Sequence, residues 1–201
     1  MNLVQADSMA PMLAADESLI QRVASHVLLS QAAGRLPRLE WHLNLSATER
    51  QKLRTRWPQP CAFWGQLEQR EAVIDAPVDH ADLLMPLLAL LMAHRAGADD
   101  ALTVLSNMLA CACFGSHHLW QDLGATGRDE VSQLLKIGFP ALFASNTRNL
   151  RWKRHLFLVL GEQLGRQDLR PPKCDHCDNY EACFGAAFQP ATKTWPLKPG
   201  R

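Results

Sequence analysis

Hydrophobic residues recur along this chain at intervals of three and four, the spacing that places them on one face of an α-helix. The first run begins after Asp16, and Gly34 is expected to end it. It carries Leu19, Ile20, Val23, Val27 and Leu28. Strand-like alternation of apolar and polar residues is scarce, so the pattern predicts an all-α fold.

Further helices are predicted over most of the chain. Ser46, with Glu49 three residues later, forms a capping-box pattern for a short helix that ends before Pro58. The next segment is ambiguous apart from a short helix at 63–71. Helices at 79–95 and 101–114, with Asp79 and then Asp99 or Asp100 as caps, are expected to pair antiparallel and form the centre of the core. Helices at 127–137 and 149–164 follow, separated by a break at Phe139 and Pro140.

The helical pattern ends after Gly165. Arg170 to Lys173 is then predicted to be an extended linker that leads to a cysteine cluster. We therefore expect one domain: a flexible N-terminus at 1–15, a helical domain at 16–188 with a cysteine motif at 174–183, and a flexible tail at 189–201.

Charge and apolar runs exclude several classes of function. Lys and Arg total 21 against 20 Asp and Glu, so no strong field favours nucleic acid or an anionic membrane. The most apolar run, 83–93, is shorter than a bilayer span and contains Pro86. The N-terminus has no secretory pattern. We expect a cytoplasmic protein without a nucleic-acid or membrane partner.

Three of the six cysteines are spaced C-x2-C-x5-C, as Cys174, Cys177 and Cys183. The first two can share one side of a tight loop, and a short helical turn begun by Asp178 or Asn179 can bring in the third. Three thiolates suit zinc, an iron–sulfur cluster or a heterometal cluster. A thiol redox role is weaker because no βαβ pattern surrounds the pair.

The remaining cysteines, Cys61, Cys111 and Cys113, lie in apolar stretches. Free cysteine is among the most buried residue types, so core packing is the favoured interpretation for these three.

Two segments together give the chain a family resemblance. His118 to Gly124 reads HLWQDLG, and Asn146 to Arg154 reads NTRNLRWKR, about twenty residues before the cysteines and Cys183-Phe184-Gly185. This order resembles the NifQ family. The resemblance implies a carrier, not an enzyme, that holds molybdenum in a Mo–Fe–S cluster and passes it to the proteins that assemble the nitrogenase iron–molybdenum cofactor. Where the family has two further cysteines, this chain has Leu169 and Gly161.

Histidines and basic residues are further candidates for the site. His118 matches the family's histidine and is a candidate fourth metal ligand, ahead of His117 and His176, because neutral imidazole commonly binds metals. Four basic residues are candidates for docking molybdate, an oxyanion, although a solvated face is the default interpretation. They are Arg148, Arg151, Lys153 and Arg154. A zinc-stabilised helical interaction module and a thiol redox protein remain the alternative functions.

Overall fold

The computed structural model describes residues 10–37, 46–58, 81–167, 169–172, 174 and 180–184, and all regular structure in these ranges is helical. The elements are α1 (Ala10–Ala32), α2 (Ala47–Arg56), η2 (Ala81–Leu83), α4 (Leu84–Ala93), α5 (Asp100–Ala112), α6 (Leu119–Asp122), α7 (Arg128–Gly138), α8 (Pro140–Ser145), α9 (Trp152–Gln163) and α10 (Tyr180–Phe184). The predicted helical class is confirmed. The short helix expected at 63–71 and most of the predicted cysteine loop lie outside the described residues.

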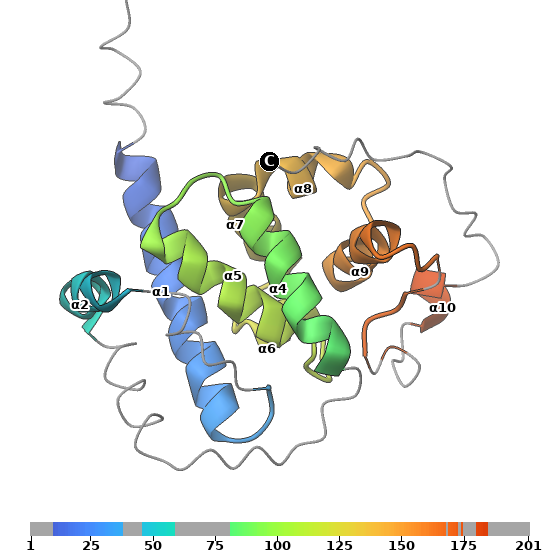
Figure 1. Ribbon diagram of the computed structural model, residues 1–201, viewed down its shortest axis with the longest axis horizontal. Coiled ribbons are helices and arrows are strands. Elements are labelled where there is room, and N and C mark those ends of the chain that lie inside the picture. The colour runs from blue at the N-terminus through green and yellow to red at the C-terminus, as the bar shows by residue number, and fades with distance from the viewer. Residues whose placement is uncertain are drawn as a thin grey trace, which may run out of the picture.

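Helix α5 is the centre of the core, as the pattern predicted (Figure 1). Its side chains are buried from Thr103 to Ala112, and it packs against both α1 and α4. Asp99 caps the helix, because its carboxylate accepts a hydrogen bond from the Ala101 N–H at 2.7 Å. A helix buried on nearly every side organises the other helices around it.

Helix α1 buries a single face against this centre. The buried side chains follow the predicted spacing and are Leu19, Ile20, Val23, Ala24, Val27 and Leu28. The helix begins at Ala10, earlier than the predicted start at Asp16. Pro11 lies in its first turn, where the missing N–H of proline has no intrahelical partner to lose.

The apolar segment 83–93 forms a helix although it contains a proline. Pro86 falls in the first turn of α4 and does not break it. Helix α4 contacts α5 on one side and α9 on another. Within the described ranges no helix is both long and apolar enough to cross a membrane.

The starts of two helices in the C-terminal half, α8 and α9, differ from the prediction. Pro140 does not merely break the chain but opens α8, since proline fits the first position of a helix. Helix α9 begins at Trp152 instead of Asn149, because Asn149 takes a left-handed conformation with φ of 52°. Arg148 and Arg151 therefore precede the helix.

A buried histidine on α9 predicts acid sensitivity. Burial lowers the pKa of His155 to about 4, and its Nε2 lies 2.8 Å from Ser145 Oγ and 3.2 Å from the Leu142 carbonyl oxygen. The unfolded chain binds a proton near pH 6.5, whereas the folded chain does not until about pH 4. Stability should therefore fall by up to about 3 kcal/mol as pH drops through this window. The free energy of unfolding in urea, measured at several pH values, should fall less steeply with decreasing pH for His155→Asn than for the parent chain. An equal pH dependence in both proteins would contradict this assignment.

Candidate functional site

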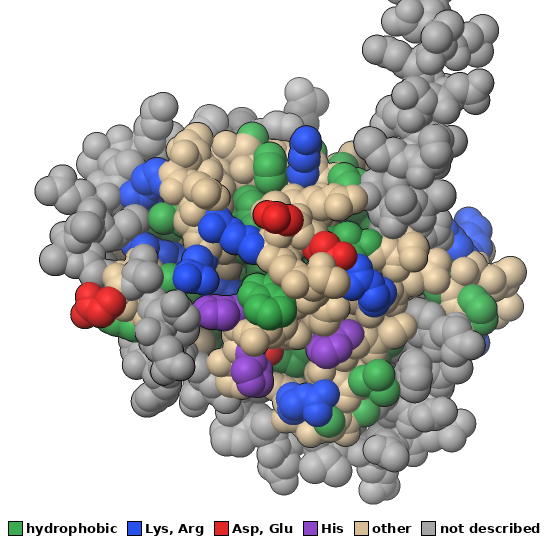
Figure 2. Space-filling view, turned by 180° about the vertical axis from the view of Figure 1, so that it is seen from behind, with side chains coloured by type: hydrophobic (Ala, Val, Ile, Leu, Met, Phe, Trp, Pro, Cys, Tyr) green, Lys and Arg blue, Asp and Glu red, His purple; other side chains and the backbone are tan. Residues whose placement is uncertain are grey.

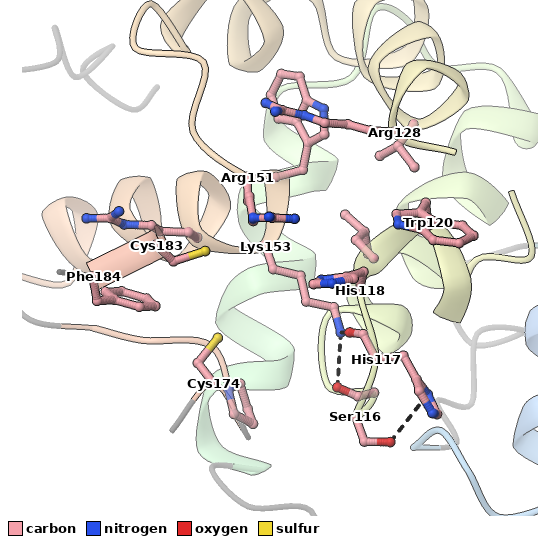
Figure 3. A pocket seen from close by; sticks show the side chains of 16 residues that line it. Ser116, His117, His118, Trp120, Arg128, Arg151, Lys153, Cys174, Cys183 and Phe184 are labelled. Atoms are coloured by element: carbon pink, nitrogen blue, oxygen red, sulfur yellow. Dashed lines mark hydrogen bonds between the residues drawn. The ribbon is translucent and has the colours of Figure 1, made fainter. Parts of the chain in front are cut away.

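A pocket opens where three helix starts meet the C-terminal segment. Its walls come from the segment before α6, the first turns of α7 and α9, and the chain around the cysteines, and its volume is about 110 Å³. Figure 3 shows the sulfur atoms of Cys174 and Cys183 on one side of this pocket and the imidazole of His118 on another. Residues far apart in sequence are thus collected at one place.

Two of the three predicted thiolate ligands line the pocket. Cys174 and Cys183 are half-buried and form no disulfide, and Cys177 lies outside the described residues. Among the described residues, no three His, Cys, Asp or Glu side chains are close enough together to hold a metal ion. Cys174, Cys183 and His118 therefore share the pocket without forming a closed ligand set on their own.

His118 precedes α6 and has the properties of a neutral metal ligand. Burial lowers the pKa of its imidazole, and the positive charges of Arg151 and Lys153 lower it further. Its backbone N–H donates to Gln121 Oε1 at 3.0 Å, which fixes the start of α6. The neutral form of imidazole is the form in which histidine binds metals.

The walls of the pocket are cationic. Its lining includes Arg128, Arg151 and Arg154, together with Lys153, whose charge is paired with Asp122, and none of its described lining residues is Asp or Glu. On the face shown in Figure 2, Lys and Arg side chains lie near histidines. This charge favours an anionic occupant.

The four residues predicted to dock molybdate have different surroundings. Arg151 is exposed and borders the pocket directly before α9, whereas Arg148 does not line it. Lys153 forms a nearly buried ion pair with Asp122. Arg154 is 8% exposed, and its guanidinium lies over the ring of Phe184, 4.5 Å from the centroid. The predicted solvated face is therefore wrong for Lys153 and Arg154.

Arg128 is a pocket residue that the sequence did not single out. Its Nη2 donates to the carbonyl oxygens of Asn149 and Leu150, both at 2.9 Å, and to Asn149 Oδ1 at 2.6 Å. These contacts hold the left-handed turn that leads into α9. The only sequence signal was a basic residue at the start of α7.

Two stacked aromatic rings and two arginines hold α10, the helix that carries Cys183, against the rest of the structure. Tyr180 and Phe184 stack on α10 with ring centroids 5.1 Å apart, and Arg170 lies over both rings. Arg154 from α9 covers Phe184 as well. Cation–π contacts of this kind join α10 to α9 and direct Cys183 towards the pocket.

The buried cysteines should react differently from those in the pocket. Burial raises the pKa of the Cys113 thiol to about 12, and the side chain is fully buried, as predicted from its apolar surroundings. At about pH 8, iodoacetamide should label Cys174 and Cys183 but not Cys113, because the thiolate is the nucleophile. Peptide mass spectrometry gives the labelling at each site, with urea-unfolded protein as the control. Native Cys113 labelled as fast as Cys183 would contradict the structure.

Leu169 and Gly161, which stand at two cysteine positions of the resemblance, are neighbours in space. A Cβ added to Gly161 would lie 3.0 Å from Leu169 Cβ and 2.4 Å from the Arg166 carbonyl oxygen. Leu169 packs against the core and does not line the pocket. Leu169→Cys should therefore leave metal affinity unchanged, as measured by Co²⁺ titration beside Leu164→Cys. Tighter binding by Leu169→Cys alone would refute this.

The donor set fits a soft metal or an iron–sulfur cluster. Thiolates and neutral imidazole are preferred ligands of such centres, and an anionic cluster would be stabilised by the cationic walls. Cys174, Cys183 and His118 are the described residues that would hold it, together with Cys177.

Comparison with known proteins gives one consistent family. The NifQ family profile matches residues 23–185. Protein NifQ of Azotobacter vinelandii is 35% identical over 170 residues, which cover 80% of this chain and 85% of that protein. Protein NifQ of Rhodobacter capsulatus is 31% identical over 157 residues, covering 78% and 83%. A NifQ homolog of Sinorhizobium fredii is 38% identical over 100 residues, covering 50% and 44%. No solved structure matches the chain.

Proposed function

The chain belongs to the NifQ family, and from this premise we propose that it carries molybdenum for synthesis of the nitrogenase iron–molybdenum cofactor. Membership of the family supports a role in nitrogen fixation. The observation that carries the finer proposal is that Cys174, Cys183 and His118 line one cationic pocket. In this proposal the protein is a carrier that acts in the cytoplasm, not an enzyme with turnover.

Each group has a separate task in the proposed site. The thiolates of Cys174, Cys177 and Cys183 hold a Mo–Fe–S cluster, and the imidazole of His118 is a fourth ligand that can be exchanged. Thiolates bind iron and molybdenum firmly, whereas a single imidazole is displaced more readily by an incoming group. A site with one exchangeable ligand is suited to handing over its metal.

Molybdate arrives as an oxyanion, and Arg151 is the basic residue best placed to meet it. It is exposed, borders the pocket and lies next to His118, whose pKa its charge lowers. Arg154 adds charge from the buried side of the pocket. A guanidinium can pair with two oxygens of a tetrahedral oxyanion at once.

The test is nitrogen-fixing growth when molybdate is scarce. A diazotroph that lacks its own family member should recover molybdenum-dependent acetylene reduction when it expresses this chain, and Cys174→Ser and Cys183→Ser should not restore it. Excess molybdate should make the defect smaller, because molybdenum can then reach cofactor synthesis in part without the carrier. Equal rescue by both cysteine variants would refute the carrier function.

A further inference from the structure

The ammonium group of Lys153 donates to two carbonyl oxygens of the segment that precedes His118 and to the carboxylate of Asp122 in α6. Nζ donates to the carbonyl oxygens of His117 at 2.7 Å and Gly115 at 3.0 Å, and to Asp122 Oδ2 at 2.6 Å. A lysine ammonium has three N–H donors, so three oxygens satisfy it. The side chains of Lys153 and Asp122 are 11% and 6% exposed, so water screens this ion pair little.

The carboxylate of Asp122 also contacts the segment from Gly115 to His117. Its carboxylate accepts from the His117 backbone N–H at 3.2 Å and lies 3.3 Å from His117 Nδ1. A Cβ added to Gly115 would lie 2.3 Å from Asp122 Cγ, so the segment wraps the carboxylate closely. Gly115 to His117 is therefore fixed at both ends, directly before His118.

The next residue of α9 makes the corresponding contact on the cysteine side. Arg154 covers the ring of Phe184, which follows Cys183 on α10. Consecutive residues in the first turn of α9 thus hold two segments that are far apart in sequence. One segment carries the imidazole and the other carries a thiol. Figure 3 shows Lys153 between His118 and Cys183 in that view.

We propose that the first turn of α9 is a frame that sets the position of His118 relative to Cys183, with Lys153, Asp122 and Arg154 as positioning residues. Lys153 then acts through Gly115 and His117 and not as a docking group for an anion, because its donors are already used. The inference rests on the proposed function in one respect, namely that the imidazole and the thiols bind the same metal.

The frame can be tested first without metal, by amide hydrogen exchange on the full chain. Lys153→Met should speed exchange at 115–118 by about tenfold or more and leave 180–184 unchanged. Arg154→Met should do the reverse, so each variant is the control for the other. Lys136→Met, at an exposed lysine of α7, should change neither segment. If Lys153→Met does not yield folded protein, Asp122→Asn should show the same selective effect at smaller amplitude.

The second readout uses Cd²⁺ as the probe, because the ¹¹³Cd chemical shift distinguishes nitrogen from sulfur ligands. Lys153→Met should move the shift and the affinity towards those of His118→Ala, and the double variant should be no worse than His118→Ala alone. Additive losses, or unchanged exchange at 115–118, would overturn the frame. Parent protein that binds no Cd²⁺ but shows the expected exchange pattern would overturn the proposed function and the metal role of the frame, while leaving its structural contacts intact.

Discussion

Asp122→Ala is expected to destabilise the protein by about 3–5 kcal/mol, because it leaves the Lys153 ammonium nearly buried without its counter-charge. The substitution also removes the acceptor for the His117 backbone N–H. A buried charge that loses its partner keeps the full cost of desolvation, whereas the intact pair offsets it. The free energy of unfolding in urea measures the effect.

The matched control is an acidic residue in an exposed pair. Asp82 lies 3.7 Å from Arg166 and its side chain is 69% exposed, so Asp82→Ala should cost no more than about 0.5 kcal/mol. Similar losses in both variants would mean that the Lys153–Asp122 pair is as well solvated as a surface pair. That result would contradict the described burial.

Cys174→Ser is expected to lower the metal affinity of the pocket by on the order of 100-fold. Four ligands in sulfur-rich zinc sites share roughly 10–16 kcal/mol, so one ligand accounts for about 3 kcal/mol. A serine hydroxyl does not replace a thiolate, because it remains protonated and is a hard donor. Iron and molybdenum per chain, measured after gel filtration, should fall accordingly.

Cys113→Ala is the control for this substitution. Cys113 is fully buried and does not line the pocket, so its loss should leave the metal content unchanged. If Cys113→Ala lost as much metal as Cys174→Ser, the loss would reflect general destabilisation and not ligation.

The core was predictable because its hydrophobic residues repeat at helical spacing. Helix α1 presents the expected face, and α5 and α4 pair as their apolar content and short connection indicated. Local backbone geometry was harder to predict. The left-handed turn at Asn149 is held by Arg128, a contact across 21 residues that no local pattern reveals. For this reason α9 begins at Trp152 and not at the predicted Asn149.

The site was predictable in its residue types but not in its contacts. The cysteine spacing indicated Cys174 and Cys183, the family resemblance added His118, and the structure brings all three to one pocket. The basic cluster was interpreted from charge alone, which cannot distinguish a free lysine from one bound to a carboxylate 31 residues away. The role of Lys153 follows from its ion pair with Asp122. This pair joins residues far apart in the sequence, so only the folded structure reveals it.

Metal and acid-labile sulfide analysis, with a visible spectrum, tests the carrier function most directly. The protein should be purified without air from cells supplied with molybdate. We predict that iron, sulfide and molybdenum copurify with the parent chain and are lost together from Cys174→Ser and Cys183→Ser. Zinc alone would instead indicate a zinc-stabilised interaction module, and protein without metal but with reactive thiols would indicate a redox role; either result would contradict the account.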